Sequence, residues 1–159
     1  MKQALILKNL GGEVSAAQLE AINRFSRRAL EADEVYVFSL LLCDNAVDRD
    51  GERFSSGALQ KLASLFVGKT GIFNHDPKGQ NQTARIFETA VETDDGRVVE
   101  NGEPYRALRA WAYMVRCPKN EDLILEIDAG IKKEVSVGCA VGKVLCSVCG
   151  ADLRDQPCG

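Results

Sequence analysis

The stretch YRALRAWAYMV, residues 105–115, predicts a strand at the centre of a sheet. Its apolar residues are dense, as in strands that are covered on both faces. Two further segments predict strands beside it. EVYVFSLLLC at 34–43 is rich in β-branched and aromatic residues, and TARIFETAVET at 83–93 ends just before a turn signal, Asp95-Gly96. Shorter strands are expected in residues 1–14, at 71–73 and within 131–146.

Three helices are expected between these strands. The first begins at Ser15, which forms a capping-box pattern with Gln18, and apolar residues recur at helical spacing as far as Leu30. A second helix is expected over 56–66, and a third follows Pro118 and ends at Gly130. Because strands and helices do not alternate regularly, we expect an α+β fold whose sheet is antiparallel or barrel-like.

Composition and charge exclude several classes of function. The chain has 159 residues and a formal net charge of −3, so charge gives it no general attraction to nucleic acid or anionic lipid. No apolar run approaches the roughly 20 residues that span a bilayer, and the apolar run near the N-terminus is too short for a signal peptide. We therefore expect a protein that is not secreted. In a reducing compartment, six cysteines indicate metal binding or reactivity before disulfides.

Three of these cysteines predict a structural zinc site. The segment CSVCG at 146–150 has the C-x₂-C-G form of a zinc knuckle, and one more cysteine follows eight residues later. The predicted metal ligands are Cys146, Cys149 and Cys158. Structural zinc takes four ligands, so the fourth comes from Cys139, from His75 or from residues beyond a truncated C-terminus. The last alternative is favoured, because the sequence stops at Gly159 with only three ligands in this stretch. A redox pair is the alternative.

His75 is the only histidine and lies in Asn74-His75-Asp76-Pro77, where an apolar strand gives way to a loop. Imidazole titrates near neutral pH, so a histidine held there can act as a general base. The alternative is a surface histidine in an Asx-type turn.

Ser136 lies in KEVSVGC at 133–139. Strand alternation predicts that Ser136 and Gly138 share one face, opposite Val135 and Val137, with room for a substrate backbone beside the glycine. A serine in a strand is more often structural, and nucleophilic work requires a base within reach. Cys139 is the competing nucleophile, and we interpret it as a small buried thiol.

Three blocks, taken in order, resemble the prohead maturation proteases of tailed bacteriophages, which are similar in fold to the herpesvirus assemblin proteases. They are GKTGIFNHDP at 68–77, QTARIF at 82–87 and IDAGIKKEVSVGC at 127–139, and a D-x-x-G turn at 48–54 precedes them. The resemblance covers 33–145 and implies an α+β fold with a mainly antiparallel β-barrel and flanking helices, incomplete at the C-terminus. It divides the chain into an N-terminal arm and helix (1–32), a protease-like domain (33–145) and an incomplete zinc knuckle (146–159).

The resemblance implies a serine endopeptidase that cuts scaffold and major capsid protein precursors inside the procapsid, in the host bacterial cytoplasm. Ser136 would be the nucleophile and His75 the base, with no cofactor for catalysis, and the enzyme would form a homodimer as the herpesvirus enzymes do. A third catalytic residue is implied in a later strand, whereas Asp152 and Asp155 lie in the cysteine-rich stretch.

Two other classes of protein were weighed against the protease. One is a catalytically silent, zinc-bearing structural or interaction protein of a phage virion. The other is a zinc-finger nucleic-acid binder, which the negative charge and the absence of paired histidines disfavour.

Overall fold

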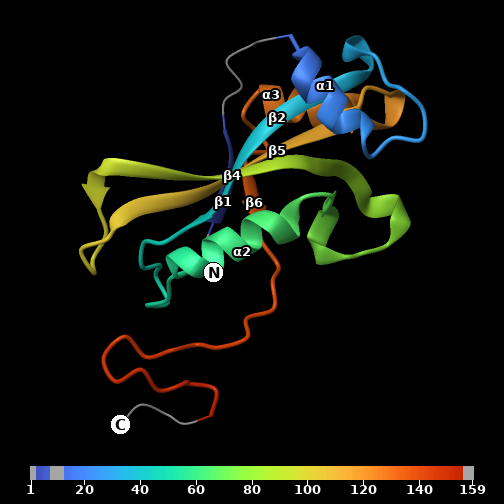
Figure 1. Cartoon of the computed structure of the whole chain (residues 1–159). Coiled ribbons are helices and arrows are strands. Elements are labelled where there is room, and N and C mark those ends of the chain that lie inside the picture. The colour runs from blue at the N-terminus through green and yellow to red at the C-terminus, as the bar shows by residue number, and fades with distance from the viewer. Residues whose placement is uncertain (1–2, 8–12, 156–159) are drawn as a thin grey trace.

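The computed structural model describes residues 3–7 and 13–155 (Figure 1). In these residues six strands form one sheet, and three α-helices accompany it. The strands are β1 Gln3–Leu7, β2 Val35–Asp44, β3 Thr70–Ile72, β4 Gln82–Val98, β5 Pro104–Val115 and β6 Glu134–Ser136. The helices are α1 Ala16–Asn23, α2 Ser56–Phe66 and α3 Glu121–Asp128. The chain is therefore α+β, as the sequence predicts.

The sheet is antiparallel at every pairing, with the strand order β3-β4-β5-β2-β1-β6. β5 has neighbours on both sides, which confirms that residues 105–115 are central. The sheet curls into a half-barrel, and a closed barrel is not shown, because β3 and β6 stand at its two ends. This open, curled form determines where the candidate site residues lie.

Helices cover both faces of the sheet, and side chains of β2 alternate between the two layers. Val35 and Val37 pack with Ile22 of α1 on one face. Phe38 and its neighbours on the other face pack with Leu59 of α2. Figure 1 shows α1 above the sheet and α2 below it. Burial of both faces explains why β2 is apolar at almost every position.

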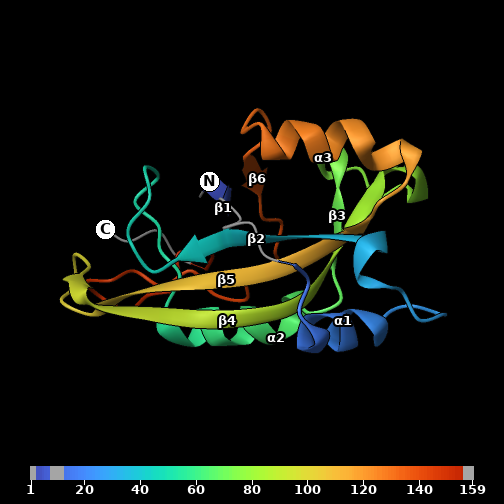
Figure 2. The same cartoon turned by 90° about the horizontal axis from the view of Figure 1, so that it is seen from above.

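α3 is fastened to the sheet by one polar contact and an apolar face. The Tyr36 hydroxyl donates a hydrogen bond of 2.6 Å to Oδ1 of Asp128 at the end of α3. Burial and this carboxylate together raise the pKa of Tyr36 above its usual value. Ile124 belongs to the same apolar cluster as Val135, which β6 contributes. In Figure 2 both β3 and β6 run toward α3.

The helix predictions are confirmed, with one shorter than expected. Ser15 caps α1 through the capping box with Gln18, and α2 covers 56–66. The first helix stops at Asn23 instead of continuing to Leu30. The Asn23 side chain accepts a 2.8 Å hydrogen bond from the Leu30 backbone N–H and donates one of 3.1 Å to its carbonyl, so it holds the following residues in a loop.

The prediction of a turn at Asp95-Gly96 is wrong. β4 continues to Val98, and its pairing with β5 changes register between Asp94 and Val98. The chain reverses later, where the Val99 N–H donates to the Glu103 carbonyl and Gly102 has a φ of +82°. Asp and Gly therefore mark a bulge at 95–96, and the glycine that requires a left-handed backbone is Gly102.

Two further predictions need correction. The strand expected within 131–146 is regular only over β6, Glu134–Ser136, because β1, its partner, is itself short. Cys139 is exposed and not buried. It follows the end of β6, where no neighbouring strand covers the chain. Cys43, by contrast, is buried as expected.

Candidate functional site

His75 ends a short 3-10 turn, Phe73–His75, that follows edge strand β3. Asn74 and His75 both have left-handed backbones, with φ of 55° and 54°. This conformation costs about 1–2 kcal/mol for most residues and collects at functional sites. Asn74 and His75 are the only two non-glycine residues with a positive φ among the described residues, although asparagine and histidine adopt it more often than most residues.

The loop after His75 is held from several sides. The Asp76 N–H donates to the Phe73 carbonyl, and the Asn81 side chain donates to the Asp76 carbonyl over 3.2 Å. The Asp76 carboxylate pairs with Lys78 at 3.0 Å. Lys119, just before α3, donates to the Gln80 carbonyl over 3.1 Å. The imidazole is thus exposed on a loop whose backbone is fixed on both sides.

Ser136 lies on β6 at the opposite end of the sheet. Its strand is held by β1, in the register Ala4↔Val135 and Leu5↔Glu134. Val135 and Val137 are half-buried and pack against the main apolar cluster. Ser136 and Gly138 are exposed, so the alternation expected from the sequence is present in this segment. β6 ends at Ser136, so Gly138 lies just beyond the strand.

The curl of the sheet brings the two ends together at His75. A Cβ built on Gly138 would lie 3.6 Å from Nδ1 and 3.8 Å from Cε1 of the His75 ring. A second contact crosses the same gap, since the Lys132 ammonium lies 5.8 Å from the centre of the Phe73 ring. Two residues of extended chain span about 7 Å, so Ser136 lies in the same neighbourhood as the imidazole.

This arrangement brings together two of the side-chain groups that acyl transfer needs, a hydroxyl and an imidazole. Gly138 presents no side chain, so the His75 ring lies close to the backbone at this position. Asp152, which the sequence places in the cysteine-rich stretch, makes its contacts there. Its Oδ1 accepts from the backbone N–H groups of Val144 and Arg154, both at 3.2 Å, within the C-terminal hairpin.

Two of the three predicted zinc ligands lie in the C-terminal stretch that the structure describes. Cys146 and Cys149 are in a hairpin near the end of the described chain, and Cys158 lies outside the described residues. Among residues 3–7 and 13–155, no group of three or more His, Cys, Asp or Glu side chains could hold a metal ion. The structure thus describes two of the three predicted ligands.

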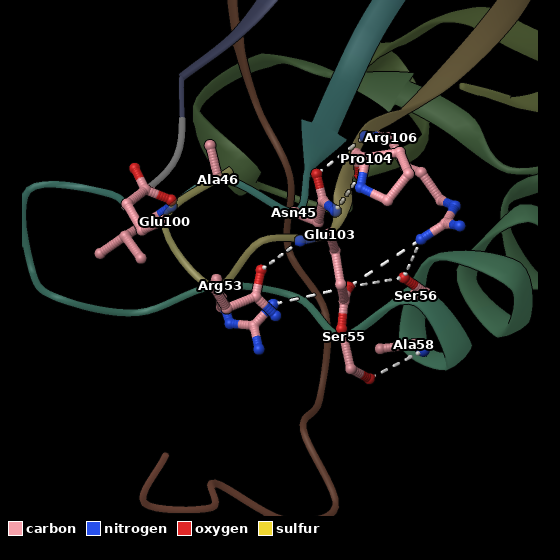
Figure 3. A network of polar contacts seen from close by, with 12 residues as sticks. Asn45, Ala46, Arg53, Ser55, Ser56, Ala58, Glu100, Glu103, Pro104 and Arg106 are labelled. Carbon is pink, nitrogen blue, oxygen red and sulfur yellow. Dashed lines mark hydrogen bonds and ion pairs between the residues drawn. The ribbon is translucent and has the colours of Figure 1, made fainter. Parts of the chain in front are cut away.

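A polar network that the sequence did not reveal fixes the other end of β5 (Figure 3). Asn45 is fully buried; its Oδ1 accepts from the Arg106 N–H over 2.8 Å, and its Nδ2 donates to the Pro104 carbonyl over 2.9 Å. The Arg106 guanidinium donates to Ser56 of α2, which in turn donates to Glu103. The only sequence signal was a polar residue directly after an apolar strand.

This network also explains the D-x-x-G turn. Asp48 Oδ1 accepts from the N–H groups of Asp50 and Glu52, and Gly51 has a φ of +76°. Arg53, at the end of the turn, pairs with Glu103 at 3.8 Å. The turn is therefore a fixed connection between β2 and α2, and it lies at the end of β4 and β5 that is distant from His75.

Comparisons with family models, with curated proteins and with solved structures found no match to this chain. In the part of the chain that the structure describes, no helix combines the length and the apolar character needed to cross a membrane.

Proposed function

We propose that this chain is a serine endopeptidase of the prohead-maturation type, in which Ser136 is the nucleophile and His75 the general base. One observation carries the proposal. His75 follows β3 and Ser136 lies on β6, and these strands are at opposite ends of the sheet. The imidazole nevertheless lies against Gly138, an exposed residue two positions after Ser136. The strained backbone of His75 supports it further.

The chemistry would run in two steps. The Ser136 hydroxyl attacks the scissile carbonyl while His75 accepts its proton, and the imidazolium then gives that proton to the leaving amine. Water, activated by the same imidazole, hydrolyses the acyl-enzyme and releases the serine. Asp76 pairs with Lys78, so we assign it no part in orienting the ring.

The substrates we propose are scaffold and major capsid protein precursors, processed inside a procapsid. This part of the proposal is supported by the resemblance of blocks 68–77, 82–87 and 127–139 to the phage proteases. Such precursors reach the enzyme as extended segments, and the exposed position of Ser136 beside a residue without a side chain suits a main chain that passes close by.

Co-expression with the precursor proteins tests the proposal. We expect the chain to cleave a precursor, Ser136→Ala to abolish cleavage, and His75→Gln to slow it by about 10²–10⁴-fold. Ser64→Ala is the matched control, because Ser64 is exposed on α2 and belongs neither to β6 nor to the turn at 73–75. Undiminished cleavage by Ser136→Ala would refute the serine mechanism. Labelling by a fluorophosphonate probe gives a second readout on the purified chain.

A second candidate function is a catalytically silent, zinc-bearing structural protein of a virion. The ordered turn around Cys146 and Cys149 favours it. This alternative predicts bound zinc and no cleavage of any precursor. The unmodified chain and Ser136→Ala would then behave alike.

A further inference from the structure

The two lysines that flank α3 each contact the loop that carries His75, one on either side of the histidine. Just before α3, the Lys119 ammonium donates to the Gln80 carbonyl over 3.1 Å. Just after α3, the Lys132 ammonium lies 5.8 Å from the centre of the Phe73 ring. The loop is therefore held from outside the sheet, by the two ends of one helix.

This helix supports the sheet where a strand is missing. β3 stands at one end of the described sheet, so β4 is its only strand neighbour there. In Figure 2, α3 extends from the side of β6 to the side of β3. The chain then leads from α3 into β6, and beyond that strand Gly138 meets the His75 ring. The segment that carries Ser136 thus also holds the histidine loop.

Lys132 is itself held in place by α3. Its ammonium lies 2.7 Å from Oε2 of Glu126. Its backbone N–H donates to the Glu126 carbonyl over 3.1 Å, and the Ile131 N–H donates to the same carbonyl over 2.9 Å. The Lys132 side chain is 49% exposed, so these contacts, and not burial, determine where its charge lies.

Phe73 is the residue through which a contact can reach the imidazole. It begins the 3-10 turn Phe73–His75, and its carbonyl accepts a 3.0 Å hydrogen bond from the Asp76 N–H. Asn74 and His75 have left-handed backbones, a conformation that persists where the surrounding contacts hold it. A contact that fixes the Phe73 ring therefore also fixes the direction of the histidine two residues later.

We propose that Lys132 is a positioning residue for His75. Its ammonium, held by Glu126, attracts the Phe73 ring and so fixes the turn that presents the imidazole to Gly138. The charge is what matters, because a cation is attracted to the face of an aromatic ring. The consequence for peptide cleavage rests on the proposed function, whereas the effect on the position of the ring does not.

The first test is nuclear magnetic resonance of the single histidine in the full chain. Lys132→Met retains an unbranched side chain and removes the charge. It should shift the His75 ring resonances and weaken the nuclear Overhauser effect between the ring and the α-protons of Gly138. Lys132→Arg retains a cation that binds both a carboxylate and an aromatic face, so it should keep both signals as they are in the unmodified chain.

Lys133→Met is the matched control. It makes the same change of charge one residue further on, and the Lys133 ammonium lies 3.9 Å from a carboxylate oxygen of the adjacent Glu134. This variant should leave both signals of His75 unchanged. Unshifted resonances in Lys132→Met would overturn the proposal, and so would equal shifts in Lys132→Met and Lys133→Met or in Lys132→Met and Lys132→Arg.

A double-mutant cycle tests whether the Phe73 ring transmits the effect. Phe73→Leu keeps an apolar side chain and removes the aromatic face, so it should shift the His75 resonances by itself. Adding Lys132→Met to Phe73→Leu should then change them little further, because the cation has lost its ring. Two fully additive shifts would contradict the proposed route through Phe73.

Precursor cleavage gives a readout that a merely structural role would not move. Loss of one exposed cation–π contact should lower the kcat of Lys132→Met about 2–5-fold. KM should stay unchanged, because the ring loses its position and the substrate loses no contact. The midpoint of thermal unfolding should also stay unchanged, since exposed substitutions rarely alter stability. Lys132→Arg should restore kcat; a lower unfolding midpoint with unchanged kcat would reduce Lys132 to a structural residue.

The positioning role and the proposed function fail separately. If the unmodified chain cleaves no precursor and Lys132→Met still shifts the His75 resonances, the function is refuted and the positioning role is supported. If the unmodified chain cleaves precursors and Lys132→Met does so with full kcat, the function is supported and the role of Lys132 is refuted.

Discussion

Substitution of Gly138 tests the geometry of the candidate site directly. The chain has a single histidine, so His75 gives one set of imidazole resonances that needs no assignment among several. A methyl group at Gly138 would lie 3.6 Å from Nδ1 and 3.8 Å from Cε1, which is ordinary van der Waals contact. Gly138→Ala should therefore change stability by less than about 0.5 kcal/mol and activity by about twofold at most.

Valine at the same position should have a much larger effect. Its γ-carbons extend about 1.5 Å beyond Cβ and fill two of the three staggered positions, so the imidazole must move by on the order of 1 Å. A displacement of that size in a catalytic group costs about 10²-fold in rate. Gly138→Val should thus shift the His75 resonances and cut precursor cleavage by about two orders of magnitude.

The assay pairs nuclear magnetic resonance of His75 with cleavage of the precursor by each variant. Gly142→Val is the matched control, because a Cβ at Gly142 meets nothing within 4 Å and its φ is not left-handed. If Gly138→Val leaves the His75 resonances where they are in the unmodified chain, the contact between the two ends of the sheet does not exist. Shifted resonances with unchanged cleavage would remove His75 from the catalytic site.

Three further predictions concern stability. Asn45→Ala leaves two backbone groups without their partner in a fully buried position, and should lower the free energy of unfolding by about 2–4 kcal/mol in urea titrations. Tyr36→Phe removes the hydrogen bond to Asp128 and should cost about 1.5–3 kcal/mol, with faster amide exchange in α3. Burial of Tyr105, followed by the nearby Asp44 carboxylate, raises the pKa of Tyr105 to about 12. The stability that the protonated Tyr105 contributes is therefore complete below pH 10 and disappears between pH 10 and 12. Tyr105→Phe should flatten the loss of stability over that interval; an unchanged profile would contradict the assignment.

The local parts of the fold could be predicted because local signals determine them. Residues 56–66 have apolar residues at helical spacing, and α2 has those bounds, with Ser55 as its N-cap. Residues 105–115 are apolar at nearly every position because β5 has a strand at each edge and an apolar cluster on each face. The prediction of a turn at 95–96 was wrong for a physical reason, since Asp and Gly favour bulges and turns alike.

The relation between His75 and Gly138 could not be read from the sequence. The two residues are far apart along the chain, and their contact depends on how strongly the sheet curls, which many small twists determine together. The left-handed backbone of Asn74 and His75 has only a weak residue signature, since both residue types are enriched in that conformation but adopt it at few of their positions. The choice of Ser136 and His75 as a pair came from a resemblance, and only a three-dimensional arrangement gives a physical reason to test it.

The position of β6 has a consequence for the order of folding. β6 joins the sheet through β1 alone, so Ala4 must pair with Val135 before the strand that carries Ser136 has a place. Contacts between residues so distant in sequence form slowly and late. During synthesis, β1 leaves the ribosome long before β6 has been made. Under the proposed function, a nascent chain without β6 would not yet have Ser136 near His75, and it would stay inactive until almost all of the described sheet had assembled.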